Sequence, residues 1–439
     1  MSQLTVAAFA LACLFAIGSS AIATSLCFCL FAIKQLLQGS AGVFRDSLAG
    51  SQSINVIIAL VSGIAGTRQV IQTPAKMRGF LNPTWYLTMA LYLWALTSCV
   101  WSYAPSLGFE SFVAAAPYLL LFLVIVPLIV TNIDDWRRVT GAWFVISFCV
   151  AALILLNPDF TMKSGRLGLD LGIAGLKNSR TNPLETGTIG GFCILLGLLY
   201  SGSSRPTILV VFRLAAVLVG TALAVKSGSR GQFFAAVIAA ALAYPVAKPV
   251  TDIRRTVTAA IVIVVFLGVV VLLADQVMTS GGFQDEKRWS SSGLESGSGV
   301  RFENIFVLLS EYANSPGRWL TGLGFYSFSA IDSTQDYSHC ISVDMLAELG
   351  VLGFVLYLAI IVRVVKDTIA SLAAVSNSLE LRNALGCLVG LLIYQFLLAN
   401  KQGNLLGSCM LFTAAFIMAR IRRAAVGIED SPLVSESRV

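Results

Sequence analysis

Residues 112–131 read FVAAAPYLLLFLVIVPLIVT, a run without a single charged side chain. A helix needs about 20 mostly apolar residues to cross the hydrocarbon core of a bilayer, and this run is long enough. Eleven further runs are similar, so that twelve segments lie near 4–37, 53–71, 84–101, 112–131, 139–157, 184–200, 207–225, 230–247, 257–275, 341–366, 382–400 and 404–421. The sequence therefore predicts an all-α integral membrane protein with about 12 transmembrane helices.

The composition agrees with this prediction. Of the 439 residues, 56% are hydrophobic and only 12% are charged, whereas a soluble domain carries about 25% charged residues. Such a chain cannot cover a water-facing surface, which excludes a soluble enzyme, a disordered protein and a nucleic-acid-binding domain. The net charge of +7 indicates an anionic partner only after the cations that set membrane topology are set aside.

The cysteines and the single histidine limit the metal chemistry. Eight of the nine cysteines lie in apolar runs, Cys340 lies at a loop edge, and no two form a CxxC pair. A disulfide framework or a zinc ribbon is therefore not expected. His339 is the only histidine, so a site with several histidines is impossible. We expect neither a metal ion nor a cofactor.

Lys and Arg in the short loops predict the orientation, because cytoplasmic loops are rich in both. Placing the C-terminus inside puts the short basic loops on the cytoplasmic side and both termini with them. The expected division is helices 1–9 over residues 1–275, a non-cytoplasmic loop over 276–340, helices 10–12 over 341–423 and a tail over 424–439. Segment 4–37 is one tilted helix or two short ones, because Gly18-Ser19-Ser20 can break it.

The loop over 276–340 is far longer than an idle connection needs to be. Its part 281–299 is rich in Gly and Ser, which predicts a flexible segment. Residues 300–312 read as a short amphipathic helix, with Phe302, Ile305, Phe306 and Leu309 sharing one stripe. This helix either lies on the bilayer surface as structure or forms a lid over a site.

Four arginines on the non-cytoplasmic side are candidates for binding an anion. Arg166 and Arg180 lie in the loop before helix 184–200, and Arg230 and Arg301 open predicted helices. A cation at a helix N-terminus is unfavourable with the macrodipole, but a bound anion reverses that penalty because backbone N–H groups and the guanidinium then point at it together. The alternative is that these side chains reach lipid phosphates.

His339 is the candidate catalytic group. An imidazole with a pKa near 6.5 can take a proton from a hydroxyl at neutral pH, although a lone histidine is also common as an ordinary surface residue. Asp344 and Glu348 follow at i, i+4 spacing and can cap the next helix, hold an arginine or orient His339. Arg213 is the only charge clearly inside an apolar run, and this scarcity counts against a proton- or ion-coupled transporter.

Four patches in order resemble the superfamily of bacterial O-antigen ligases and O-antigen polymerases. They are Asn178 to Gly191, Ser227-Gly228-Ser229-Arg230-Gly231, Ser298-Gly299-Val300-Arg301 through to Gly322-Leu323-Gly324-Phe325, and His339 followed by Leu346-Ala347-Glu348-Leu349-Gly350-Val351-Leu352-Gly353. The resemblance covers roughly residues 160–420. The sequence departs from the family at Cys340, where the family often has Asn after the histidine. If that Asn holds the acceptor in the family, another residue must hold it in this chain.

The resemblance implies a fold of about twelve helices in the bacterial inner membrane, with the active site facing the periplasm. It implies an inverting, metal-independent glycosyltransferase whose donor is a glycan on a polyprenyl (undecaprenyl) diphosphate. On this reading Arg166 or Arg180, Arg230 and Arg301 hold the diphosphate, and His339 is the general base on the acceptor hydroxyl. The acceptor is lipid A-core for a ligase of lipopolysaccharide synthesis, or another lipid-linked repeat for a polymerase. Two alternatives belong to other classes of protein: a lipid-linked-glycan transporter or flippase, and a non-catalytic assembly subunit.

Overall fold

The computed structural model describes residues 2–40, 44, 48–74, 79–163, 166–170, 181–201, 206–248, 291–332 and 337–425. The predicted span 257–275, Arg180, residues 276–290 and most of the tail over 424–439 lie outside them. The described chain is mostly helical, as predicted. It divides into unit 1, which comprises 1–62, 137–300 and 382–394, and unit 2, which comprises 63–136, 301–381 and 395–439.

Among the described residues, six helices are long and apolar enough to cross a membrane, or seven if a bent pair is counted as one span. This confirms the membrane class. The six lie in α5 (Leu48–Gln72), the continuous stretch Pro105–Ile129, α9 (Ile133–Leu156), α11 (Pro206–Lys226), α12 (Arg230–Ala247) and α18 (Leu379–Gln402). Helices α5, α9, and α18 contribute residues to both units.

The first apolar run, 4–37, forms three helices. Helix α1 (Ser2–Gly18) ends at the predicted break, and Ser19 caps α2 (Ser20–Phe28) by accepting a hydrogen bond from the Ile22 amide at 3.4 Å. Helix α3 (Leu30–Ser40) continues α2 with a bend of 76°. Both pack against α1, so the run folds back on itself.

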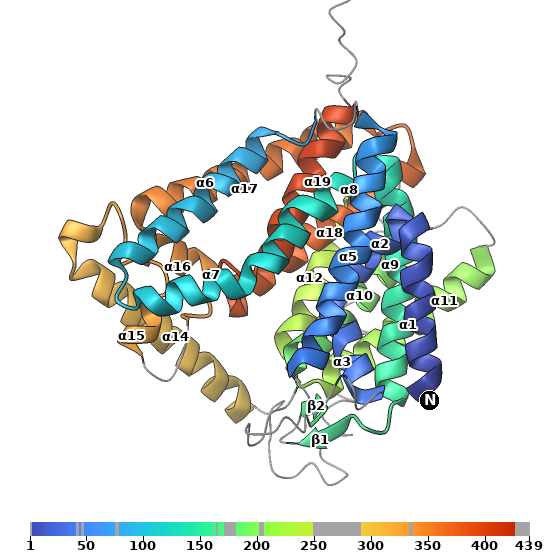
Figure 1. Ribbon diagram of the computed structural model, residues 1–439, viewed down its shortest axis with the longest axis horizontal. Helices are drawn as coiled ribbons and strands as arrows, with labels where there is room; N and C mark the ends of the chain where they lie inside the picture. Colours follow the sequence, from blue (N-terminus) through green and yellow to red (C-terminus); the bar gives the residue numbers. More distant parts are fainter. Residues whose placement is uncertain are drawn as a thin grey trace, which may run out of the picture. The chain divides into compact units, whose positions relative to one another are not determined.

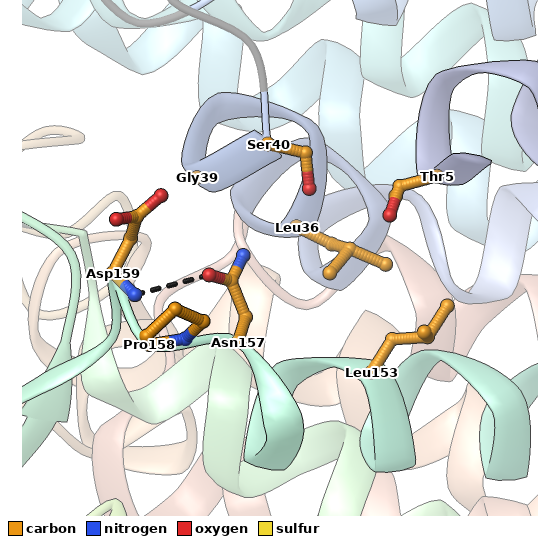
Figure 2. A pocket seen from close by; sticks show the side chains of 8 residues that line it. All are labelled: Thr5, Leu36, Gly39, Ser40, Leu153, Asn157, Pro158 and Asp159. Atoms are coloured by element: carbon orange, nitrogen blue, oxygen red, sulfur yellow. Dashed lines mark hydrogen bonds between the residues drawn. The ribbon is translucent and has the colours of Figure 1, made fainter. Parts of the chain in front are cut away.

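This hairpin corrects the expected place of the first residues. Thr5 lines the same cavity as Asn157 and Asp159, which follow α9. The start of α1 therefore lies at the same end of unit 1 as residues 157–159, where α9 is followed by the expected loop (Figure 2). The topology with a single helix over 4–37 put these two parts of the chain on opposite sides, and that expectation is wrong.

Helix α10 (Pro183–Leu199) is buried over most of its length and packs against both α11 and α12, and Figure 1 shows α11 at the edge of the unit. Glycines bring α10 and α11 together: a Cβ on Gly190 would lie 2.7 Å from the carbonyl oxygen of Gly220. Small residues at such a crossing let two helix backbones approach closely. The guanidinium of Arg213 donates to the carbonyls of Gly197 and Leu198 at 2.8 and 2.9 Å, so the charge inside this run is bound to the end of α10.

Unit 1 also contains two short strands that the sequence did not predict. Strand β1 (Thr161–Lys163) pairs antiparallel with β2 (Arg166–Gly168). They follow α9 and precede α10, inside the expected loop 158–183. The all-α prediction holds for the described elements apart from this small hairpin.

Unit 2 is built around α6 (Pro83–Ser98), α17 (Gly350–Ala374) and α19 (Cys409–Ala425), and Figure 1 shows α6 beside α17. The stretch Pro105–Ile129 consists of α7 (Pro105–Leu119), a π-helical segment over Leu120–Ile125 and α8 (Val126–Ile129). At one end of the unit, buried Asp367 accepts from Arg422 at 2.7 Å and pairs with Arg363 at 3.4 Å. Arg363 and Arg422, two of the basic residues expected on the cytoplasmic side, thus share one buried carboxylate.

Two predictions for the second half of the chain are wrong. The segment 341–366 is not one helix: α16 (Ile341–Ala347) is separated from α17, which starts at Gly350 with a φ of 71°. Residues 291–299 are not an irregular segment, because they belong to α14 (Ser291–Ala313). Helix α14 is followed by the turn Pro316–Arg318 and by α15 (Phe328–Ile331).

The apolar stripe expected on α14 is not its packed face. Phe302 and Phe306 are 72% and 76% exposed, whereas Asn304 and Leu308 are buried. Leu308 joins a cluster with Leu323, Phe328 and Ala347. This cluster fixes the second half of α14 against α15 and α16.

Candidate functional site

His339 lies directly before α16, in a backbone conformation that few residues adopt. Its φ is 69°, in the left-handed region where non-glycine residues are uncommon and where strain concentrates at functional sites. The ring of Tyr337 meets the imidazole edge-on, with 4.4 Å between the ring centroids. The side chain of His339 is half-buried.

Ser338 and Asp344 hold the turn that carries His339. The Ser338 hydroxyl donates to Asp344 Oδ1 at 2.5 Å and accepts from the Cys340 amide at 3.2 Å. The Asp344 amide donates to the Cys340 carbonyl at 3.0 Å. Asp344 is therefore a buried anchor for the residues on both sides of His339, which is one of the roles that the sequence left open for it.

A second anchor comes from α18. The Ser342 hydroxyl donates to Asn400 Oδ1 at 2.5 Å, and Cys340 Sγ lies 3.8 Å from the same oxygen. The Asn400 amide donates to the Phe396 carbonyl at 2.9 Å. Sequence reasoning missed Asn400 and Ser338, although the polar run Asn400 to Asn404 at the end of an apolar segment was a usable signal.

Glu348 binds backbone rather than an arginine. Its carboxylate accepts from the amides of Tyr326 and Phe328 at 3.2 and 3.0 Å. Helix α16 is too short to span a membrane, and α17 is not among the candidate spans. Burial raises the pKa of Glu348 to about 7, and burial with the neighbouring charge of Glu348 raises the pKa of Asp344.

Two of the patches quoted above come together at the break between α16 and α17. Backbone bonds join 319–324 to 347–352: Leu323 N to Ala347 O at 3.0 Å, Gly324 N to Glu348 O at 2.8 Å, and Val351 N to Trp319 O at 2.9 Å. Gly322, Gly324 and Gly350 have φ values of 80°, 103° and 71°. The glycines in both patches are thus explained by a close backbone-to-backbone contact.

Arg301, on α14, belongs to the same unit. Its guanidinium is half-buried, and burial lowers its pKa while the Tyr337 hydroxyl acts in the opposite direction. Tyr337, which acts on the pKa of Arg301, also meets the imidazole of His339 with its ring. The arrangement places a cation, a phenol and an imidazole in one neighbourhood.

The other two patches meet in unit 1. Arg230 is the first residue of α12, and the hydroxyl of Ser229 donates to the Pro183 carbonyl at 3.1 Å. Gly187 makes room for this contact, because a Cβ there would lie 2.6 Å from Ser229 Cβ. The turn 227–230 is thus packed on the first turns of α10.

Arg166 is connected to the same helix through the hairpin. It opens β2, and the following Leu169 exchanges hydrogen bonds with Thr181 at 2.9 Å, one to the Thr181 hydroxyl and one from its amide. Asn182 then caps α10 by accepting from the Leu184 amide at 3.0 Å. The structure therefore ties Arg166 and Arg230 to one helix start, while Arg180 lies outside the described residues.

A buried polar network at this helix start was not predicted. Gln35 Nε2 donates to the Asn182 carbonyl and to Glu185 Oε2, both at 2.8 Å, and Gln35 Oε1 accepts from Thr186 at 2.7 Å. These bonds hold α3 against α10. Within the described part of the chain, no group of three or more His, Cys, Asp or Glu side chains could hold a metal ion.

No protein-family model matches this chain, and a search of the curated proteins finds no match either.

Proposed function

We propose that this protein is an inverting glycosyltransferase of the bacterial inner membrane. It has about twelve spans, its active site faces the periplasm, and its donor is a glycan on a polyprenyl diphosphate. The acceptor is a sugar hydroxyl, with lipid A-core as the preferred acceptor, which makes the protein an O-antigen ligase. A polymerase of the same superfamily uses the same donor and chemistry and differs only in the acceptor.

The observation that carries the proposal is the support given to His339. Its turn is anchored by Asp344 through Ser338 and by Asn400 through Ser342. The ring of Tyr337 meets the imidazole, and half-buried Arg301 lies on α14 in the same unit. Strained left-handed backbone concentrates at functional sites, and here it is held by two hydrogen-bonded anchors, one of which, Asp344, is buried.

The roles follow from this chemistry. His339 takes the proton from the acceptor hydroxyl as the oxygen attacks the anomeric carbon. A new glycosidic C–O bond forms while the C–O bond to the diphosphate breaks, and the diphosphate leaves with the electron pair. The arginines that the sequence singled out, Arg166, Arg180, Arg230 and Arg301, are proposed to stabilise the charge on the departing diphosphate. One well-placed donor of this kind is worth about 3 kcal/mol of barrier.

The test is transfer in membranes from cells that make His339→Gln. The substitution keeps a polar side chain but removes the base, so we expect transfer to fall about 10²- to 10⁴-fold. Glu303→Gln is the matched control, because Glu303 is exposed on α14. Full transfer by His339→Gln at the wild-type protein level refutes the mechanism and favours a transporter or flippase.

The surface glycan of a deletion strain distinguishes the two acceptors. Long chains retained on the carrier lipid indicate a lost ligase. Single repeats on lipid A-core indicate a lost polymerase. An unchanged surface glycan refutes both assignments.

A further inference from the structure

Asn304 on α14 is a buried side chain whose amide group has no bonding partner. It is only 4% exposed, and no residue in the described part of the chain accepts a hydrogen bond from its Nδ2 atom. Burial of an amide donor without an acceptor is costly, and the large majority of buried polar side-chain atoms in folded proteins are bonded. This amide therefore points to a partner other than the described residues.

Arg301 lies one turn before Asn304 on the same face of α14. Side chains at i and i+3 in a helix have Cβ atoms about 5–6 Å apart. The guanidinium of Arg301 is half-buried, and no carboxylate in the described ranges forms an ion pair with it. One helix face thus presents a cation without a carboxylate and an amide donor without an acceptor.

The neighbours of this face show where the two donors lie. Leu308, one turn after Asn304, belongs to the cluster that packs α14 against α15 and α16. Tyr337 acts on the pKa of Arg301, and its ring meets the imidazole of His339. Asn304 therefore lies between the packed part of α14 and the part that leads to the candidate catalytic group.

The two donors select the chemistry of a ligand. A guanidinium and an amide N–H group both donate to oxygen, and hydrogen bonds from a guanidinium to an anionic oxygen are roughly twice as strong as neutral ones. An anion is therefore preferred over a neutral hydroxyl. A diphosphate carries oxygens on two phosphorus atoms, so one group can accept from both side chains at once.

We propose that Asn304 is a substrate-binding residue whose amide donates a hydrogen bond to an oxygen of the diphosphate, beside Arg301. The identity of this ligand rests on the proposed function. The site adds a neutral donor to the arginines and gives a buried amide, which the fold leaves unbonded, an acceptor when the substrate is present.

The test is binding of undecaprenyl diphosphate to the full-length protein in phosphatidylcholine nanodiscs, measured by native mass spectrometry, together with the Tm of each variant. Asn304→Leu should weaken binding about tenfold or more, because a hydrogen bond to a charged group is lost. Its Tm should be unchanged or higher, because an apolar side chain replaces an unbonded buried amide. Asn314→Leu, the same substitution at an exposed residue just after α14, is the matched control and should bind as the wild type does.

Asn304→Asp distinguishes a diphosphate from a sugar hydroxyl as the ligand. A carboxylate repels a diphosphate and accepts from a hydroxyl, so this variant should bind at least as weakly as Asn304→Leu. Binding by Asn304→Asp at the wild-type level overturns the assignment to the diphosphate.

Three other outcomes also overturn the proposal. The first is a wild type that does not bind undecaprenyl diphosphate. The second is equal binding by Asn304→Leu and the wild type, which leaves a buried water as the partner of the amide. The third is a Tm several degrees lower for Asn304→Leu, which assigns the amide to folding. Binding of this probe needs no transfer, whereas His339→Gln tests transfer, so the two proposals can fail separately.

Discussion

Gly322 offers a quantitative test of the contact between 319–324 and 347–352. In Gly322→Ala the new Cβ would overlap the carbonyl group of Glu348 and the amide of Gly350. Both neighbours are backbone groups and not flexible side chains, so the segments 319–324 and 347–352 must move apart. The φ of 80° adds a second cost for any residue with a Cβ.

The magnitude follows from these two effects. A left-handed conformation costs an alanine about 1–2 kcal/mol. Separation breaks the bonds from Leu323 N to Ala347 O and from Gly324 N to Glu348 O, each worth about 1 kcal/mol. We expect a total loss of about 3–4 kcal/mol in the free energy of unfolding.

The assay is thermal unfolding of the detergent-solubilised protein followed by tryptophan fluorescence, since Trp319 lies in the affected segment. Gly317→Ala is the matched control, because it lies in the same segment and a Cβ there meets nothing within 4 Å. We expect a Tm several degrees lower for Gly322→Ala and an unchanged Tm for Gly317→Ala. Equal Tm values for the two variants refute the close contact.

Three further predictions test other parts of the structure. Because the pKa of Glu348 is raised from 4.5 to about 7, the folded state holds its proton more tightly, so the wild-type Tm should fall as pH rises from 5 to 8, and Glu348→Gln should flatten that slope. Asp367→Asn leaves two arginines facing each other without their buried carboxylate and should cost about 3 kcal/mol, measured as a lowered Tm against the exposed-site control Glu303→Gln. Gly187→Ala should push the turn 227–230 away from α10 and reduce transfer in membranes without a comparable effect in Gly63→Ala, where a Cβ meets nothing within 4 Å.

Apolar runs were enough to locate most helices, because the length of a run decides whether it can cross a bilayer. The break before Gly350 could not be predicted in this way. Its left-handed backbone is required by residues 319–324, which are distant in the sequence. The packed face of α14 could not be predicted for the same reason, because Leu308 packs against Leu323, Phe328 and Ala347, which lie later in the sequence.

The candidate site, too, could be predicted only in part from the sequence. His339 and the arginines were chosen as candidates from residue type and position alone, and their roles stay predictions. The roles of the carboxylates could not be predicted in this way, since Asp344 binds Ser338 and Glu348 binds the amides of Tyr326 and Phe328. Asn400 was missed because its partner Ser342 is far away in the sequence.

The break between α16 and α17 also bears on the order of events during synthesis. The backbone groups of residues 319–324 bind 347–352 and have no such partner while the ribosome is still adding the residues between them. The amides of Tyr326 and Phe328 must likewise wait for their acceptor, because Glu348 is made after them. The contact between 319–324 and 347–352 is therefore completed only after residue 352 has been made, and a ribosome pause placed before that point should leave residues 319–324 sensitive to protease.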